Sequence, residues 1–306
     1  MKKIIDPYPP YDMNQVLRKC RHEPQFIVCE EEKELSFPVR VKADRKAPKF
    51  KKAVVFLKSL GTVDQPQVHL NIAGQQRLTS AEIEWVIEHV NRRFQFQSQA
   101  LPLFYKAVRD SKRLNKLTQQ LRGLPFIQYE GIFEGFVQTI IQQQVHFQFA
   151  RQLTYTLAKT FGETIEANGN TYPLLPTPEQ LAQVEVEDLH SRKFSRRKAE
   201  YLIGLARMIT DQTLDLDALA GLSNASFLER MTQVRGIGVW TVECVLLFCL
   251  GRKDVFPAGD IGLQKAIQRL EGCARRPTAD ECREWIKPYA EWASYIAVYL
   301  WGLLGE

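Results

Sequence analysis

Hydrophobic and polar residues follow different rhythms in the two parts of this 306-residue chain. In the first hundred residues, short runs rich in β-branched and aromatic residues lie between charged or turn-forming pieces, a pattern typical of strands. The strands predicted in this way are 35–43, 53–61 and 67–74. Helical spacing over 13–20 and 79–94 predicts two helices beside them. This part is therefore predicted to be α+β, a small antiparallel sheet with packed helices.

From about residue 100 the strand signal disappears and apolar residues recur at helical spacing. The segments with that spacing are 101–110, 111–123, 132–162, 177–184, 186–190, 195–213, 224–234, 239–251, 261–270 and 280–305. Turn residues divide them, notably over 166–180 and 254–260. We therefore predict two domains, an N-terminal α+β domain over 1–100 and an all-α region of two lobes over 101–306.

Composition adds little to this picture. The chain is 45% hydrophobic and 25% charged, as in an ordinary globular protein, and its net charge of +6 would suit a polyanionic partner without requiring one. The six cysteines show no tight pairing pattern, which favours reduced thiols over disulfides. The start of the chain lacks an apolar leader, and no segment approaches the roughly 18 apolar residues of a membrane span. We expect a cytoplasmic monomer that does not contact membranes.

Two glycines separated by one residue mark a candidate phosphate-binding turn. Gly236, Ile237 and Gly238 follow Arg235 and separate two helical segments. Glycine lets the backbone approach another surface closely, and the N–H groups that open the next helix can receive an anion such as a phosphate. Contacts of this kind hold the backbone of a nucleic acid without reading its bases. The alternative is a packing corner between helices that needs glycine only for clearance.

One carboxylate follows this turn, at the start of the next helical segment. Asp260 precedes the apolar-periodic residues 261–270, which is a good position for a helix N-cap. The helix dipole favours an ionised group there, so a capping role and a role as a charge-stabilising acid are compatible.

The stretch 233–267, "QVRGIGVWTVECVLLFCLGRKDVFPAGDIGLQKAI", resembles the helix-hairpin-helix and Gly/Pro…Asp element of the DNA glycosylase superfamily. Within that superfamily the chain is similar to the DNA-3-methyladenine glycosylase II branch. Further segments resemble the family's N-terminal opening, first core helix with its glutamine-rich loop, pre-hairpin stretch and closing helix. These are 8–17, 133–163, 175–189, 195–206 and 292–301.

The resemblance implies that Asp260 is the catalytic acid, which stabilises the cation-like sugar as a damaged base leaves. Members of the superfamily that also cut the strand carry a lysine where this chain has Trp240, so a purely hydrolytic enzyme is implied. The members with an iron–sulfur cluster bind it through cysteines after the final helix, and no cysteine follows Cys282 here. We therefore expect no metal cluster and no cofactor.

The residues that the resemblance assigns to the base pocket are Trp240, Trp301, Cys244 and Tyr295. Alkylated purines such as 3-methyladenine are positively charged and stack well on electron-rich rings. Cys244 stands where a tyrosine is frequent in the family, and Ala293 where an arginine is common, which leaves the range of bases open. The alternative for these aromatic residues is a place in the core.

The residues implied to bind DNA lie in three places. Gln143 and Gln144 fall in the loop that the family inserts into the duplex to replace the flipped nucleotide. Arg196 and Lys198 belong to a basic run close to the hairpin, and Arg235 begins the hairpin itself. The glutamines could instead form a polar helix face, and the basic run a solvated surface.

The function implied is therefore monofunctional excision of alkylated purines from double-stranded DNA. A glycosylase for oxidised or deaminated bases, and a non-catalytic DNA-binding protein that keeps the hairpin, are the two alternatives. The family analogy also allows a monovalent cation held by backbone carbonyls of the hairpin.

Overall fold

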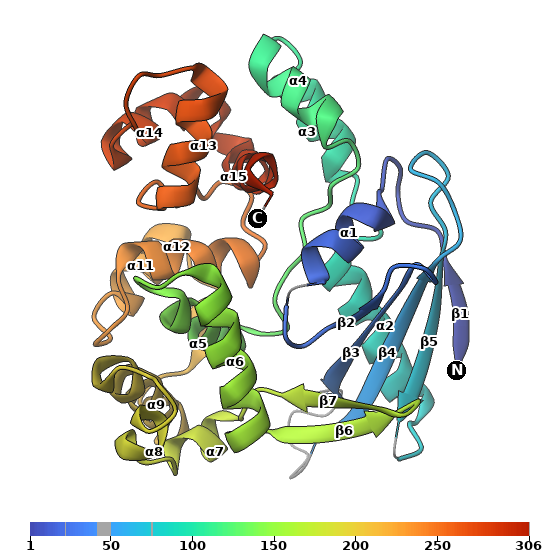
Figure 1. Cartoon of the computed structure of the whole chain (residues 1–306), viewed down its shortest axis with the longest axis vertical. Coiled ribbons are helices and arrows are strands. Elements are labelled where there is room, and N and C mark those ends of the chain that lie inside the picture. Colours follow the sequence, from blue (N-terminus) through green and yellow to red (C-terminus); the bar gives the residue numbers. More distant parts are fainter. Residues whose placement is uncertain (22, 42–49, 75, 306) are drawn as a thin grey trace.

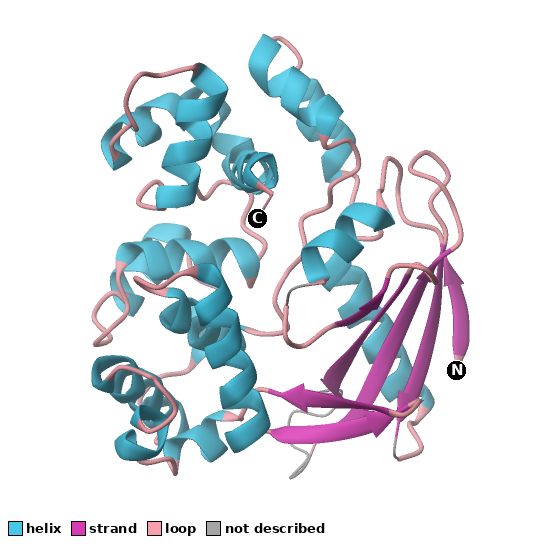
Figure 2. Ribbon diagram, viewed as in Figure 1, coloured by secondary structure: helices cyan, strands magenta, loops and turns pink. Residues whose placement is uncertain are grey.

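The computed structural model describes residues 1–21, 23–41, 50–74 and 76–305. Its N-terminal part is a five-stranded antiparallel sheet in the order β1-β5-β4-β3-β2 (Figures 1 and 2). The strands are β1 (Lys2–Ile5), β2 (Ile27–Cys29), β3 (Glu34–Val41), β4 (Lys51–Ser59) and β5 (Val68–Gly74). The predicted strands 35–43, 53–61 and 67–74 are confirmed as β3, β4 and β5, although residues 42 and 43 lie outside the described residues. The short β1 and β2 were not predicted.

The central strands β3 and β4 are buried on both faces, and alternation along β4 shows how. Val55 and Leu57 join the core under the helices α1 (Met13–Cys20) and α2 (Ser80–Phe94). Val54 and Phe56 point to the opposite face and pack with Ile165 and Tyr172 from a distant hairpin. Successive side chains of a strand point to opposite faces, so one strand serves two cores.

The rest of the chain is helical and forms two lobes (Figure 1). The lower lobe has its own core and contains α5 (Ile132–Gln142), α6 (Phe147–Phe161), α7 (Pro178–Ala182), α8 (Val186–His190), α9 (Arg196–Thr210), α10 (Leu216–Ala220), α11 (Asn224–Met231) and α12 (Val239–Phe248). The upper lobe has a second core and contains α3 (Ala100–Val108), α4 (Lys112–Gln120), α13 (Ile261–Glu271), α14 (Ala279–Ile286), the 3₁₀ helix η1 (Lys287–Trp292) and α15 (Ala293–Leu304). The predicted architecture of a small sheet domain followed by a two-lobed helical core is confirmed; the boundary at residue 100 stays a prediction.

One element departs from the all-α prediction for the second part. Residues 166–180, expected to be a turn region, contain most of a β-hairpin formed by β6 (Glu163–Ala167) and β7 (Asn170–Leu174). Asn168 and Gly169 join the strands, both with positive φ (51° and 77°). An Asn-Gly pair of this kind favours the tight turn whose twist matches two antiparallel strands. The sequence signal was present but was interpreted as a connection between helices.

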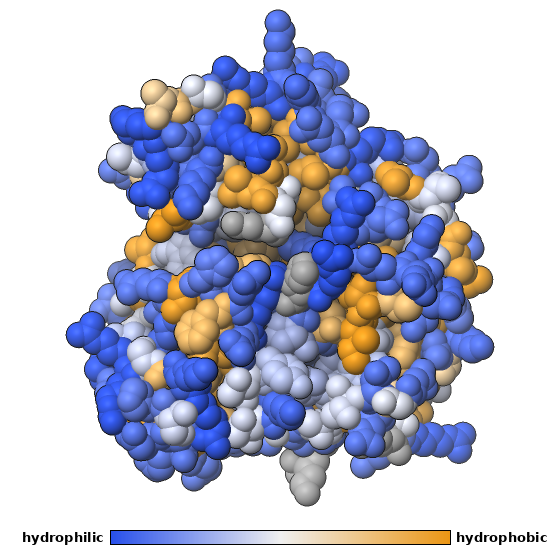
Figure 3. All heavy atoms as spheres, viewed as in Figure 1, coloured by the Kyte–Doolittle hydropathy of each residue, from blue (hydrophilic) through white to orange (hydrophobic). Residues whose placement is uncertain are grey.

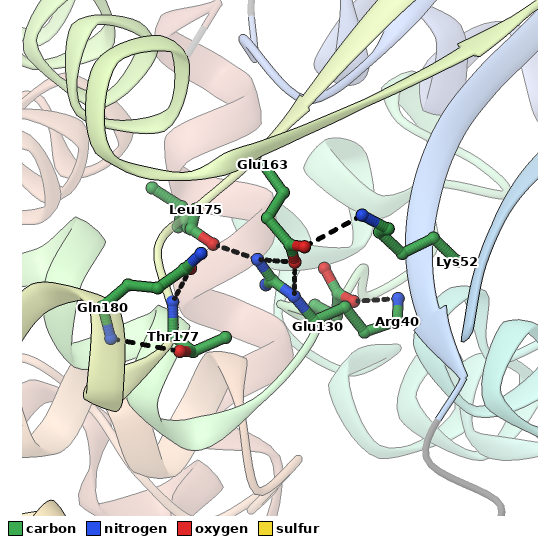
Figure 4. A network of polar contacts seen from close by, with 7 residues as sticks. All are labelled: Arg40, Lys52, Glu130, Glu163, Leu175, Thr177 and Gln180. Carbon is green, nitrogen blue, oxygen red and sulfur yellow. Dashed lines mark hydrogen bonds and ion pairs between the residues drawn. The ribbon is translucent and has the colours of Figure 1, made fainter. Parts of the chain in front are cut away.

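A buried arginine ties this hairpin to the sheet (Figure 4). The Arg40 side chain is 2% exposed and donates to the Leu175 carbonyl (2.6 Å) and, at 3.4 Å, to the Glu163 carboxylate. Lys52 donates to the other Glu163 oxygen (2.9 Å), and the Arg40 backbone N–H donates to Glu130 (3.2 Å). These charge-assisted bonds fix the helical part relative to the N-terminal sheet.

Within the described residues, none of the helices combines the length and apolar character that a membrane crossing requires.

Candidate active site

The turn between α11 and α12 presents its backbone to solvent. Gly236 has φ = +90°, and a Cβ there would lie 2.1 Å from the Tyr201 ring, so the position requires glycine. Ile237 is 4% exposed and packs into the lower core. Gly238 is the N-cap of α12 in an extended conformation, and no side chain caps this helix end. The first N–H groups of α12 are therefore open to an external anion.

The predicted helical stretch 132–162 is two helices, and the glutamine-rich loop joins them. The Gln143 amide donates to the Gly236 carbonyl (2.9 Å) and to the Thr241 hydroxyl (3.0 Å), which ties the loop to the hairpin. Gln144 has φ = +53° and is exposed. The two glutamines thus have different surroundings: Gln143 is held by the protein, and Gln144 faces solvent.

The basic residues also divide into inward and outward groups. Lys198 is 8% exposed, and its ammonium donates to the Ile141 carbonyl at the end of α5 (2.6 Å). Burial lowers the pKa of Lys198. Arg196 and Arg235 remain more than half exposed, in ion pairs with Glu187 (2.8 Å) and Glu200 (2.6 Å) respectively. Lys198 therefore supports the loop from within, while the two arginines lie on the surface.

The Asp260 carboxylate caps α13 and receives three hydrogen bonds. Oδ1 accepts from the backbone N–H of Leu263 (2.8 Å) and from Nε1 of Trp301 (3.0 Å), and Oδ2 accepts from Nε1 of Trp240 (3.1 Å). The three donors come from the start of α13, the end of α15 and the first turn of α12. The structure thus brings together the acid and two of the four residues assigned to the base pocket.

The loop before Asp260 is held by its own hydrogen bonds. The Asp260 N–H donates to the Pro257 carbonyl (2.8 Å), and the Gln264 amide donates to the Ala258 carbonyl (3.0 Å). Because the loop is held and three donors bind the carboxylate, each oxygen of Asp260 has a fixed direction before any substrate binds. Carboxylate oxygens are good acceptors, so three converging donors satisfy and orient the Asp260 side chain.

Cys244 lies on the same helix as Trp240, one turn further along. It is 4% exposed, and burial, followed by the nearby negative charge of Asp260, raises the pKa of its thiol. A protonated thiol is a small apolar group, so Cys244 supplies a compact surface beside the acid rather than a nucleophile.

Tyr295 does not join this cluster. It is 4% exposed, packs between Phe104 and Phe126, and donates its hydroxyl hydrogen to Gln95 (2.9 Å). Burial raises its pKa to about 12. Its place in the upper core agrees with the alternative that the sequence left open.

The structure adds aromatic residues that the sequence analysis missed. The Phe248 ring stacks on Trp301 (centroids 5.5 Å apart), and Tyr129 lies against Phe248 (5.3 Å). Phe248 ends a helix whose apolar residues lie on all of its sides, so its sequence pattern does not indicate which of them contacts Trp301. Tyr129 precedes α5 in a loop and carries no motif.

A hollow crosses the face of the molecule shown in Figure 3, between the upper lobe and the part of the lower lobe formed by α5 and α6. The hydrogen bonds to Asp260 join α12, from the lower lobe, to α13 and α15, from the upper lobe. The acid is therefore fixed where the two lobes meet, a common location for a ligand site.

A family model described as "HhH-GPD superfamily base excision DNA repair protein" matches residues 137–291. The Bacillus subtilis protein YfjP is 30% identical over 302 residues, 98% of each chain. The chain belongs to the HhH-GPD superfamily. Membership makes it a DNA glycosylase of base excision repair, and DNA its partner.

One further relative supports membership in the HhH-GPD superfamily, and one solved structure shares the fold. The Bacillus subtilis DNA-3-methyladenine glycosylase is 32% identical over 221 residues, 72% of this chain and 73% of that protein. The 3-methyladenine DNA glycosylase of Archaeoglobus fulgidus shares the fold, with a TM-score of 0.82 over 98% of this chain and 97% of its own at 24% identity.

Proposed function

We propose that this protein is a monofunctional DNA glycosylase that flips alkylated purines out of duplex DNA and removes them by hydrolysis, acting as a monomer in the cytoplasm. The observation that carries the proposal is the Asp260 carboxylate, held by two indole N–H groups and one backbone N–H where the two lobes meet. DNA-3-methyladenine glycosylase relatives support the choice of alkylated purines.

The chemistry assigned to Asp260 is electrostatic. As the N-glycosidic bond breaks, the electron pair leaves with the base and the sugar gains positive charge at C1′. A preoriented carboxylate stabilises that charge without having to reorganise. Water then adds to C1′, and its proton passes to solvent or to the departing base, which leaves an abasic sugar. The three donors keep the Asp260 carboxylate in one direction throughout.

We do not propose strand cleavage, because Trp240 occupies the position at which the strand-cutting members of the superfamily carry a lysine. The Nε1–H of Trp240 is engaged with Asp260 (3.1 Å), and an indole nitrogen cannot form a Schiff base with the sugar.

The DNA backbone is proposed to bind at the open N-terminus of α12, with Arg196 and Arg235 adding salt-sensitive contacts. Gln144 is the residue we assign to the space that the flipped nucleotide vacates, since its side chain is exposed. Gln143 and Lys198 hold the loop in place through their bonds to Gly236 and Ile141. A cation bound by hairpin carbonyls remains a prediction.

The base is proposed to bind against Trp240, Trp301 and Cys244. Phe248 supports Trp301 from behind by stacking. An electron-rich wall of this kind attracts bases that carry positive charge.

The test measures base release from methylated duplex DNA by wild type and Asp260→Asn. Asparagine is itself a good N-cap, so the variant removes the charge and keeps the cap. Asp215→Asn is the matched control, because Asp215 also caps a helix (α10) and accepts from Ala218 N–H at 3.0 Å. Release should fall by about 10²–10³-fold or more in Asp260→Asn and stay unchanged in Asp215→Asn.

A second measurement follows strand breakage with and without alkali. We expect breaks only after alkali, because hydrolysis leaves an intact abasic strand. Breaks without alkali would contradict the monofunctional assignment. Undiminished release by Asp260→Asn would contradict the role of the acid, and no release by wild type, with DNA binding intact, would favour a binding protein.

A further inference from the structure

The loop that carries Gln144 is held at its two ends by different parts of the molecule. Before Gln144, the Gln143 amide donates to the Gly236 carbonyl of the hairpin (2.9 Å). After it, α6 begins at Phe147, and the guanidinium carbon of Arg151, one turn further along α6, lies 3.7 Å from the centroid of the Phe147 ring. Gln144 lies between these two supports, with its side chain exposed.

The second support begins in the N-terminal sheet domain. Nη2 of Arg151 donates to the Glu23 carboxylate (3.3 Å), and the two side chains are only 18% and 17% exposed. The Glu23 backbone is fixed on both sides, because its N–H donates to the Cys20 carbonyl (3.0 Å) and its carbonyl accepts from the Phe26 N–H (3.0 Å). Cys20 and Phe26 belong to the core of the sheet domain. The carboxylate that pairs with Arg151 is therefore anchored in that domain.

The Arg151 guanidinium uses its edge for Glu23 and its face for Phe147. A planar guanidinium can make an ion pair and a cation–π contact at the same time. Its Nε–H is buried and has no hydrogen-bond partner among the described residues, so the group has little else to hold it. Loss of the Glu23 charge would leave the buried cation uncompensated, and the guanidinium would turn toward water and away from the Phe147 ring.

A second contact joins the same end of α1 to the helical part. Lys19 lies in the last turn of α1, and its ammonium is 5.6 Å from the centroid of the Phe248 ring at the end of α12. Figure 1 shows α1 on the side of the sheet domain that faces the helical lobes. The end of α1 and the turn after it thus contact both α6 and α12, the helices that follow the glutamine-rich loop and the hairpin.

We propose that Glu23 and Arg151 are positioning residues, which hold the start of α6 through Phe147 so that Gln144 enters the duplex when a nucleotide flips out. This rests on the function proposed above and deepens it, since it gives the N-terminal domain a part in base flipping. A side chain that fills the vacated space stabilises the flipped state. A small displacement of such a group can slow the reaction by about 100-fold.

The competing explanation is structural: the Glu23–Arg151 pair would merely join two parts of the molecule. In that case the loss of the pair would lower stability, and would slow base release by the same factor whether or not Gln144 is present. A double-mutant cycle distinguishes the two explanations, because two changes that act through one loop are not independent.

The experiment measures single-turnover base release from methylated duplex DNA by wild type, Glu23→Gln, Gln144→Ala and the double variant. Glutamine keeps the size of Glu23 and removes its charge. Arg151→Lys, which keeps the charge and loses the planar face, tests the next link and guards against a folding failure of Glu23→Gln. Glu30→Gln is the control, since Glu30 pairs with Arg21 (2.6 Å) at the surface of the same domain.

A second readout follows insertion without base release. Each protein is mixed with a duplex that carries 2-aminopurine beside an abasic site, and the fluorescence of that base rises when it loses its stacking partner. Affinity for the same duplex is measured by anisotropy, and thermal melting is recorded for each variant.

Glu23→Gln should slow release by about 10- to 100-fold and should reduce the 2-aminopurine signal. Affinity for the duplex should stay within about twofold of wild type, because the phosphate contacts are unchanged. In the Gln144→Ala background, Glu23→Gln should change the rate by less than about twofold. Arg151→Lys should lie between wild type and Glu23→Gln, and Glu30→Gln should match wild type.

Three results would overturn the inference and leave the glycosylase assignment intact. These are a wild-type rate in Glu23→Gln, an equal loss with and without Gln144, and unfolding of both Glu23→Gln and Arg151→Lys at the assay temperature. No release of any base by wild type would instead overturn the proposed function, and this inference with it.

Discussion

Two successive helices, α12 and α13, begin in opposite ways. The N-terminus of α12 is preceded by Gly238 and has no side-chain cap, whereas that of α13 is capped by the Asp260 carboxylate. Both ends carry the partial positive charge of a helix dipole. One end is left open, so that an anion from outside can bind there. The other is filled by the Asp260 carboxylate of the protein itself, which is thereby held in place for the chemistry that we propose.

The proposed function needs both a glycine and an aspartate within one short stretch of the chain. A carboxylate at position 238 would fill the end that we assign to the DNA backbone, and a glycine at position 260 would leave the sugar without a counter-charge. The four predictions below alter one helix start, or one carboxylate, at a time.

The largest effect is expected when the turn before the uncapped N-terminus of α12 is displaced. In Gly236→Ala the new Cβ would lie 2.1 Å from the Tyr201 ring, in a backbone conformation that side chains disfavour, so the turn must shift. We expect a loss of about 3 kcal/mol in the free energy of unfolding and of about 100-fold in DNA affinity, measured by denaturant titration and by fluorescence anisotropy with an abasic duplex. Gly221→Ala is the control, because its Cβ would approach no atom closer than 3.7 Å. Wild-type affinity in Gly236→Ala would show that the turn does not hold DNA.

A smaller effect should follow when a carboxylate is placed at the uncapped N-terminus of α12. Gly238→Asp places a carboxylate at the N-cap of α12, where an added Cβ meets nothing within 4 Å. The helix should gain a few tenths of a kcal/mol from the cap, while DNA affinity falls about 10- to 30-fold because the carboxylate competes with phosphate. The loss should shrink as salt is raised.

Gly238→Ala is the matched control for that variant, since it adds the Cβ without a charge or a cap. It should bind DNA within about twofold of wild type. Equal affinity of the aspartate and alanine variants, at low salt, would mean that no phosphate binds at this helix end.

The sequence was sufficient for features that local chemistry determines. The strands β3 to β5 follow from their β-branched residues, and the separation of the two helical lobes from the sheet follows from the change in periodicity. Asp260 could be recognised as a cap, and the motif around it identified the family. The β6–β7 hairpin was not predicted, because its strands are only five residues long and β7 contains a proline, which strands disfavour.

The remaining features depend on tertiary contacts. Lys198 belongs to a basic run and nothing in that run shows that its side chain turns inward to the Ile141 carbonyl. The same holds for Lys19, which reaches a helix more than two hundred residues away. Gln143 and Gln144 are identical in type and adjacent, yet only the structure separates the one that braces the hairpin from the one that faces solvent.

The third prediction removes one of the three hydrogen bonds to the Asp260 carboxylate and keeps that carboxylate at the start of α13. Trp301→Phe removes one N–H donor to Asp260 Oδ1 and keeps a ring to stack on Phe248. One hydrogen bond to a charged group should matter by about tenfold in the single-turnover rate, with DNA affinity unchanged. Trp285→Phe is the control, because that indole also donates to a carboxylate, Glu271 (3.2 Å), outside the site. A rate equal to wild type would show that the indole does not help to orient the acid.

The smallest effect concerns a second carboxylate, in the middle of α12, whose surroundings contrast with those of Asp260. Glu243 is partly buried, and among the described residues its Oε2 has no hydrogen-bond partner. Burial, partly offset by Arg283, raises its pKa from the ordinary value of 4.5 to about 7. Because the folded protein holds this proton more tightly than the unfolded chain, the stabilisation is complete below about pH 4.5 and is lost as the pH rises through 7.

Glu243→Gln keeps the size of the side chain and removes the titration. The full shift corresponds to about 3 kcal/mol, which partial solvent exposure reduces to about 1 kcal/mol. The variant should therefore unfold at higher urea than wild type at pH 8, and the difference should diminish toward pH 5. Glu229→Gln, at an exposed position of α11, should follow wild type at both pH values. Equal stability of Glu243→Gln and wild type at pH 8 would contradict this prediction. It would mean that the Glu243 carboxylate is hydrogen-bonded in solution, as the Asp260 carboxylate is in the structure.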